Sequence, residues 1–174
     1  AVPASFTASS TSGVGAHADV NWFNSDDNSS YVDFIDVNAV GYWRFEETSG
    51  TTAYDSSGYD NNGLYGAGAA APTQTSGKMG GALNFNSGQG DYVNVGNSSK
   101  LEIPTTLTMA LWVKVSSTDS QYRTLIMKLT NGSTQSYGLT LPSYIPNVYL
   151  AGVSSPGWHA SNSAIPVNAW THIA

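Results

Sequence analysis

The stretch GYWRFEETSGTTAYDSSGYDNNGLYG, residues 41–66, begins the part of the sequence that decides the fold. It continues through GKMGGALNFNSGQGDYVNV, residues 77–95, and LTMALWVKV, residues 107–115. Short aromatic and apolar runs alternate in these segments with turns made of Gly, Asn, Asp and Ser, which is the pattern of strands joined by tight turns. In residues 107–114 apolar side chains occupy every second position, as they do in a strand with one buried face. The sequence therefore predicts an all-β fold.

The composition supports one β domain and excludes several classes of protein. The chain has 174 residues, with 18 Gly, 7 Pro and only 10% charged residues, so long amphipathic helices are not expected. Its formal net charge is −6 and its six Lys and Arg residues are scattered, so no basic stripe exists to bind nucleic acid. No apolar run approaches the roughly 18 residues that a membrane span requires. The absence of Cys excludes disulfides, cysteine-based zinc sites and thiol nucleophiles.

The chain divides into an extension and a main domain. Residues 1–38 begin with a small, polar segment and then carry VNWF and YVDFIDV, so this extension is a linker, a hairpin or a donated strand. Residues 39–174 form the predicted domain. Its later strands are expected at residues 124–130, 136–141, 147–153 and 169–174.

The order of short motifs along this domain resembles a known family. The motifs are Trp43-Arg44-Phe45-Glu46-Glu47, Thr52-Ala53-Tyr54-Asp55-Ser56-Ser57-Gly58, Asn61-Asn62-Gly63, Gly80-Gly81-Ala82-Leu83-Asn84-Phe85, Asp91-Tyr92-Val93, Leu111-Trp112-Val113-Lys114 and Trp170-Thr171-His172-Ile173. Together they resemble the laminin-G-like branch of the concanavalin A-like lectin/glucanase superfamily. The resemblance implies a pentraxin-like jelly-roll β-sandwich over residues 39–174, with the extension before it.

The resemblance also raises an expectation about the end of the domain. In the family, a segment like residues 169–173 is an interior strand that further strands follow. We therefore expect a sandwich that is incomplete at its C-terminus, with the remaining strands supplied by the extension or by another subunit.

An oxygen-rich loop between residues 55 and 63 is a candidate calcium site. Carboxylate and amide oxygens at short spacing, with glycines that permit tight turns, suit Ca²⁺. The resemblance implies a structural calcium near this loop with help from an acid on an early strand. The candidate ligands are Glu47, Asp55, Asp60, Asn62 and Asp91. The alternative is an Asx-turn loop whose side chains only bind backbone groups, and for Asp91 a role at a turn.

Aromatic side chains in polar loops are candidate sugar-binding residues. Sugar rings stack on aromatic faces, and Asn, Asp or His side chains bind their hydroxyls. Trp158 and His159 lie in SSPGWHASNS, which reads as an exposed loop, and Tyr122 and Tyr144 have comparable polar neighbours. Packing into the core is the alternative for Trp158.

Enzymatic activity is not expected. A glycosidase needs two carboxylates that face one substrate, which on a strand requires even spacing. Glu46 and Glu47 are adjacent and should point to opposite faces of a strand, while LTMALWVKV contains no acid. No G-x-S-x-G motif is present for a serine nucleophile.

These observations predict a non-catalytic, exported carbohydrate-binding or adhesion module that calcium stabilises and that acts outside the cell or at its surface. Its expected partner is a polysaccharide or other glycan. The alternative is a structural cell-surface subunit that assembles by strand exchange into filaments or layers, as a homo-oligomer.

Overall fold

The computed structural model describes residues 39–103, 106–116, 122–130, 134–151 and 156–174. The predicted extension, residues 1–38, lies outside the described residues, so its assignment as a linker, hairpin or donated strand stays a prediction.

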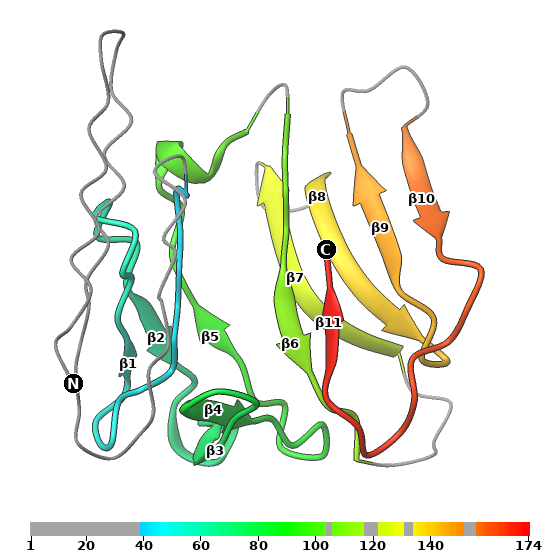
Figure 1. Ribbon diagram of the computed structural model, residues 1–174. Helices are drawn as coiled ribbons and strands as arrows, with labels where there is room; N and C mark the ends of the chain where they lie inside the picture. The colour runs from blue at the N-terminus through cyan, green and yellow to red at the C-terminus, as the bar shows by residue number, and fades with distance from the viewer. Residues whose placement is uncertain (1–38, 104–105, 117–121, 131–133, 152–155) are drawn as a thin grey trace, which may run out of the picture.

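The predicted all-β class is confirmed (Figure 1). The described strands are β1 (Thr52–Ala53), β2 (Gly63–Tyr65), β3 (Thr73–Ser76), β4 (Gly81–Asn84), β5 (Val93–Asn94), β6 (Leu111–Val113), β7 (Tyr122–Thr130), β8 (Thr134–Pro142), β9 (Asn147–Leu150), β10 (Gly157–Ala160) and β11 (Thr171–Ile173). The helical segments in this part of the chain are two 3-10 turns, η1 (Gly68–Ala70) and η2 (Ser99–Leu101). None of the helices described is long and apolar enough to cross a bilayer.

Antiparallel pairing organises these strands into four sheets. The largest has the strand order β10-β9-β8-β7, and a second has the order β1-β2-β5. The strand β6 pairs with β11, and β3 pairs with β4. Figure 1 shows the four-stranded sheet at one end of the molecule and the β1-β2-β5 sheet at the other.

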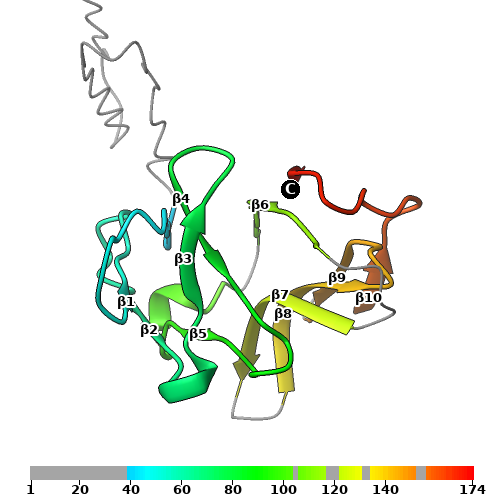
Figure 2. The same cartoon turned by 90° about the horizontal axis from the view of Figure 1, so that it is seen from below.

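The hydrophobic core lies between the four-stranded sheet and the β6–β11 pair, which occupy different layers in Figure 2. Its buried members are Val115, Leu139, Leu141, Ile165 and Ile173. Met109, Leu111 and Val113 pack against them, so the alternation in residues 107–114 did predict the face that is buried. Leu141 has no exposed surface, and burying such a side chain contributes about 1.5–3 kcal/mol.

The opposite surface of the four-stranded sheet is here called the outer face. Successive side chains of a strand alternate between faces, so Gly138 and Thr140 face outward because Leu139 and Leu141 face the core. The strand register extends this face across the sheet. Its residues are Tyr122, Thr124, Met127, Gly138, Thr140, Pro142, Asn147, Tyr149, Trp158 and Ala160.

Two local expectations were wrong. Residues 42–47 do not form a strand, and only an isolated bridge joins Trp43 to Asp55. Phe45 has a φ of 58°, in the left-handed region that interrupts the alternation of an extended chain. The segment around Trp158 is not a loop, because Gly157–Ala160 pairs with β9 as the edge strand β10.

Candidate functional site

An aromatic cluster on the outer face is the candidate binding site. Trp158 on β10 lies directly opposite Tyr149 on β9, and their ring centroids are 5.2 Å apart with an interplanar angle of 57°. Tyr122, at the start of β7, meets Trp158 edge to face at 6.4 Å and 90°. Tyr122 is 57% exposed and Trp158 is 39% exposed. The cluster therefore offers aromatic surface to solvent on a rigid sheet.

The sheet positions these rings through its register. Gly138 lies opposite both Tyr149 and Met127, so Trp158, Tyr149, Gly138 and Met127 form one row across the four strands. A Cβ atom at Gly138 would approach Met127 Sδ to 2.9 Å. The missing side chain therefore lets Met127 lie over β8, which continues the apolar row beyond Tyr149.

A polar row lies beside the aromatic one. Asn147 and Thr140 pair across β9 and β8, and the Thr140 hydroxyl donates to the Asn147 backbone carbonyl at 3.3 Å. Thr140 has no exposed surface. Asn147 Oδ1 is buried and has no hydrogen-bond partner. The cluster thus combines stacking surface with an unused acceptor, which are the two elements that sugar recognition requires.

The structure brings together two of the four predicted sugar-binding residues, Trp158 and Tyr122. His159 follows Trp158 on β10 and therefore lies on the core-facing side, opposite Val148. Tyr144 lies in the turn between β8 and β9, packs against the core, and has the Arg123 guanidinium 5.3 Å from its ring centroid. Ser143 and Tyr144 both have positive φ, which tightens this turn. Neither His159 nor Tyr144 joins the cluster.

Sequence reasoning missed Tyr149 and Asn147. Both lie in NVYL, where alternation places them on one face of a strand, and that was the available signal. Their proximity to Trp158 depends on the pairing of β9 with β10, which is a tertiary property.

The predicted calcium loop is organised by the carboxylate of Asp55. Oδ1 accepts from the backbone N–H groups of Tyr42 at 2.8 Å and Ser57 at 2.9 Å. Oδ2 accepts from the Ser57 hydroxyl at 2.7 Å and the Asn61 N–H at 2.9 Å. Asn62 Oδ1 in turn accepts from the Asp55 N–H at 2.8 Å. Each oxygen of Asp55 is therefore engaged twice, as in the Asx-turn alternative.

These contacts alter the protonation of Asp55. Burial disfavours the charged carboxylate, but the hydrogen bonds from Ser57, Tyr42 and Asn61 favour it and together lower the Asp55 pKa below its usual value. The group is thus held as an anion that stabilises the loop.

Asn61 is a second organiser of this loop and was not predicted as one. It is 4% exposed, and its side-chain amide donates to the Val40 backbone carbonyl at 2.6 Å. The backbone carbonyl of Asn61 accepts from the Trp43 indole N–H at 2.8 Å. The loop is thereby tied to the segment before β1.

The remaining predicted metal ligands are dispersed. Glu47 Oε1 accepts from the Tyr54 N–H at 2.8 Å, and Asp91 Oδ2 accepts from the Asn86 N–H at 2.7 Å in a separate turn. Asp60 is exposed. Among the residues that the structure describes, no three His, Cys, Asp or Glu side chains gather into a group that could hold a metal ion. However, Glu47 Oε2 and Asp91 Oδ1 are each buried without a partner.

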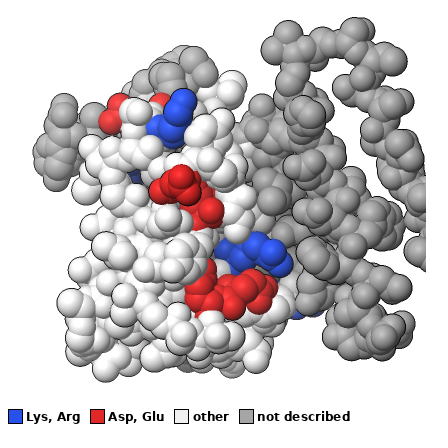
Figure 3. All heavy atoms as spheres, turned by 90° about the vertical axis from the view of Figure 1, so that its left-hand side faces the viewer, with Lys and Arg blue, Asp and Glu red and all other residues white. Residues whose placement is uncertain are grey.

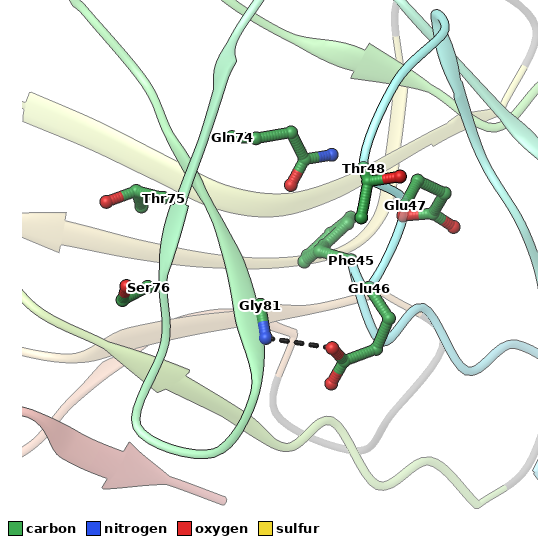
Figure 4. A pocket seen from close by; sticks show the side chains of 8 residues that line it. All are labelled: Phe45, Glu46, Glu47, Thr48, Gln74, Thr75, Ser76 and Gly81. Carbon is green, nitrogen blue, oxygen red and sulfur yellow. Dashed lines mark hydrogen bonds between the residues drawn. The ribbon is translucent and has the colours of Figure 1, made fainter.

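A shallow pocket of about 400 Å³ lies between residues 45–48 and the β3–β4 hairpin (Figure 4). It is lined by Phe45, Glu46, Glu47, Thr48, Gln74, Thr75, Ser76 and Gly81. Glu46 and Glu47 both line it, although their carboxylates bind different segments, since Glu47 Oε1 accepts from the N–H of Tyr54 after β1. Glu46 Oε2 accepts from the Gly81 N–H at 3.0 Å, which ties this segment to β4.

Burial of the Tyr65 hydroxyl and the negative charge of Glu47 raise the Tyr65 pKa, while a hydrogen bond from Gln74 opposes them. The Gln74 side-chain amide donates to the Tyr65 hydroxyl at 2.9 Å.

Figure 3 shows the side of the molecule that carries β1, where small groups of acidic and basic side chains are interspersed rather than gathered in a basic stripe.

The comparison with known protein families agrees with the resemblance seen in the sequence. The family model described as the concanavalin A-like lectin/glucanases superfamily matches residues 87–174, which is half of the chain. The matched region includes β5 to β11 and therefore the whole aromatic cluster. No curated protein and no solved structure matches the chain significantly.

Proposed function

The chain belongs to the concanavalin A-like lectin/glucanase superfamily, and on that premise we propose that it is a non-catalytic, exported carbohydrate-binding or adhesion module. The superfamily allows a carbohydrate-binding role. Export and adhesion are parts of the proposal, and they rest on the family resemblance and on the low proportion of charged residues.

One observation carries the proposal. Trp158, Tyr149 and Tyr122 form a contiguous cluster on the outer face, and two of these side chains are substantially exposed. Exposing an aromatic side chain to water is less favourable than burying it, so a contiguous cluster of exposed rings on a regular sheet indicates a binding surface. Its aromatic and hydrogen-bonding chemistry matches that of a sugar ring.

We propose that the protein is not catalytic because its two neighbouring acids, Glu46 and Glu47, both bind backbone groups. Glu46 and Glu47 share a pocket, but each binds a backbone N–H, of Gly81 and Tyr54 respectively. Carboxylates that hold backbone in this way serve as structural acceptors. We therefore propose that Glu46 and Glu47 stabilise the structure of the pocket and do not take part in a reaction.

Calcium stabilisation is proposed from the unpaired oxygens of Glu47 and Asp91. A buried carboxylate oxygen without a donor is unfavourable, and a bound cation satisfies it. Asp55 is left out of this proposal because donors already occupy both of its oxygens.

The test is retention on a panel of insoluble and soluble polysaccharides, together with an assay for released reducing sugar. The proposal expects binding to at least one polysaccharide without release of sugar. Hydrolysis that Glu46→Gln or Glu47→Gln abolishes would contradict the non-catalytic assignment, and failure to bind any glycan would contradict the binding function.

The second candidate is a structural subunit that assembles by strand exchange. The observation that favours it is that β10 is an edge strand: one side of β10 pairs with β9, and no described strand pairs with its other side. An open edge can accept a strand from another molecule. Sedimentation over a range of protein concentrations distinguishes this candidate, because it requires oligomers and the binding module does not.

A further inference from the structure

The outer face of the four-stranded sheet is uncharged. Its described residues, from Tyr122 to Ala160 as defined above, include no Asp, Glu, Lys or Arg. The opposite face of the same sheet does carry charges, at Arg123 and the buried Lys128. A ligand with carboxylate, sulfate or ammonium groups would therefore meet no countercharge from these outer-face side chains.

Asn147 supplies an acceptor that the protein itself does not use. Its Oδ1 atom is buried and unpartnered, and a buried polar group in that state is unfavourable. Asn147 lies two residues before Tyr149, so both side chains are on the outer face. It is also diagonal to Trp158 across the β9–β10 pairing, within reach of one ligand.

The rings of Tyr122 and Trp158 meet above the cross-strand pair formed by Thr140 and Asn147. Trp158 belongs to the row of Gly138, whereas Tyr122 pairs with Pro142 on the other side of Thr140. The edge-to-face contact of Tyr122 with Trp158 therefore spans the row of Thr140 and Asn147. Tyr122 is 57% exposed, and rotation of an exposed side chain is fast, so a ligand can displace its ring and reach the amide oxygen.

Resting on the proposed glycan-binding function, we propose that this face binds uncharged glycans and that Asn147 Oδ1 accepts a hydrogen bond from a sugar hydroxyl. Trp158 supplies the stacking surface, and Tyr122 swings aside to admit the ring. Asn147 then determines specificity for the position of a sugar hydroxyl, whereas stacking on the aromatic rings depends only on the shape of the sugar.

The first experiment measures binding to neutral glucan, mannan and xylan, to polygalacturonate and to chitosan, at low and at 1 M salt. The expected result is retention of a neutral polymer with affinity that changes less than about twofold with salt, since no ion pairs contribute. Binding restricted to the anionic or cationic polymer, and lost at 1 M salt, would overturn the inference while leaving a glycan-binding function in place.

The second experiment uses Asn147→Leu, with Asn84→Leu as the control at an exposed strand position remote in sequence. Removing an unpaired buried acceptor should raise the melting temperature. The same change should weaken neutral-glycan binding about fivefold, which corresponds to one hydrogen bond of about 1 kcal/mol. The control should bind within twofold of the unmodified protein.

Two outcomes would overturn the role of Asn147. Unchanged affinity of Asn147→Leu, where Trp158→Ala loses binding, would reject the hydroxyl acceptor and retain the aromatic site. Self-association that disappears in Trp158→Ala would assign the face to a second copy of the chain. If the unmodified protein binds no glycan, the proposed function itself fails.

Discussion

Trp158 and Tyr149 lie directly opposite each other on β10 and β9, with ring centroids 5.2 Å apart. Tyr149 is the less exposed of the two and occupies the interior strand of the pair. The relationship makes Tyr149 a support that fixes the orientation of the Trp158 ring.

Replacing Tyr149 should therefore affect a ligand that stacks mainly on Trp158. Tyr149→Ala should lower stability by about 1 kcal/mol through loss of the aromatic pair, and should also weaken glycan binding. Tyr149→Phe retains the ring and should preserve both properties. Calorimetric melting and binding titrations on the two variants measure these effects, and unchanged binding by Tyr149→Ala would exclude the supporting role.

The Asp55 carboxylate should be a major determinant of stability in its loop. In Asp55→Asn, an amide donor replaces one carboxylate oxygen and faces N–H and O–H groups that need an acceptor. We expect a loss of about 2 kcal/mol in the free energy of unfolding, measured by urea denaturation. Asp60→Asn makes the same chemical change at an exposed position in the same loop and should stay within about 0.5 kcal/mol. Equal effects of the two substitutions would remove the special role of Asp55.

The same residue predicts a pH dependence. The Asp55 pKa is lowered on folding, so the folded state favours the anion, and its contribution is fully present above the usual value of 3.8. The contribution is lost as the pH falls through the lowered folded pKa. The stability difference between the unmodified protein and Asp55→Asn should therefore be constant near neutral pH and shrink below about pH 3.8. A difference that stays constant down to strongly acidic pH would contradict the assignment.

Calcium should raise the melting temperature if it binds at the unpaired oxygens. Mass action predicts about 2.7 kcal/mol of added stability at a hundredfold excess over Kd. Glu47→Gln or Asp91→Asn should reduce this gain, depending on which carboxylate binds the ion. Identical melting curves in chelator and in millimolar calcium would remove the ion from the proposal.

The sequence predicted the features that depend on local pattern. Alternation in residues 107–114 identified the face of β6 that packs on the core, and the β-branched and aromatic runs located β7, β8, β9 and β11. The pattern failed at residues 42–47 because Phe45 adopts a left-handed conformation, which non-glycine residues rarely take and which no period reveals.

The candidate site was only partly predictable for a different reason. Trp158 and Tyr122 were identified by residue type and polar neighbours, but they meet only because four strands pair in a particular register. That register also brings in Tyr149 and Asn147, and it puts His159 on the other face. Asp55 was recognised as an oxygen donor, whereas its engagement by Tyr42 and Asn61 depends on how the preceding segment folds back.

The most direct test of the binding site compares two tryptophans of equal exposure. Trp158 and Trp112 are each 39% exposed, but Trp112 lies on β6, against His172 and Lys78. The measurement is the affinity of Trp158→Ala and of Trp112→Ala for a polysaccharide that the unmodified protein binds, with melting curves to verify folding. We expect Trp158→Ala to lose at least about 1 kcal/mol of binding free energy and Trp112→Ala to bind normally. Full affinity in a folded Trp158→Ala protein would contradict the assignment of the outer face as the sugar-binding site.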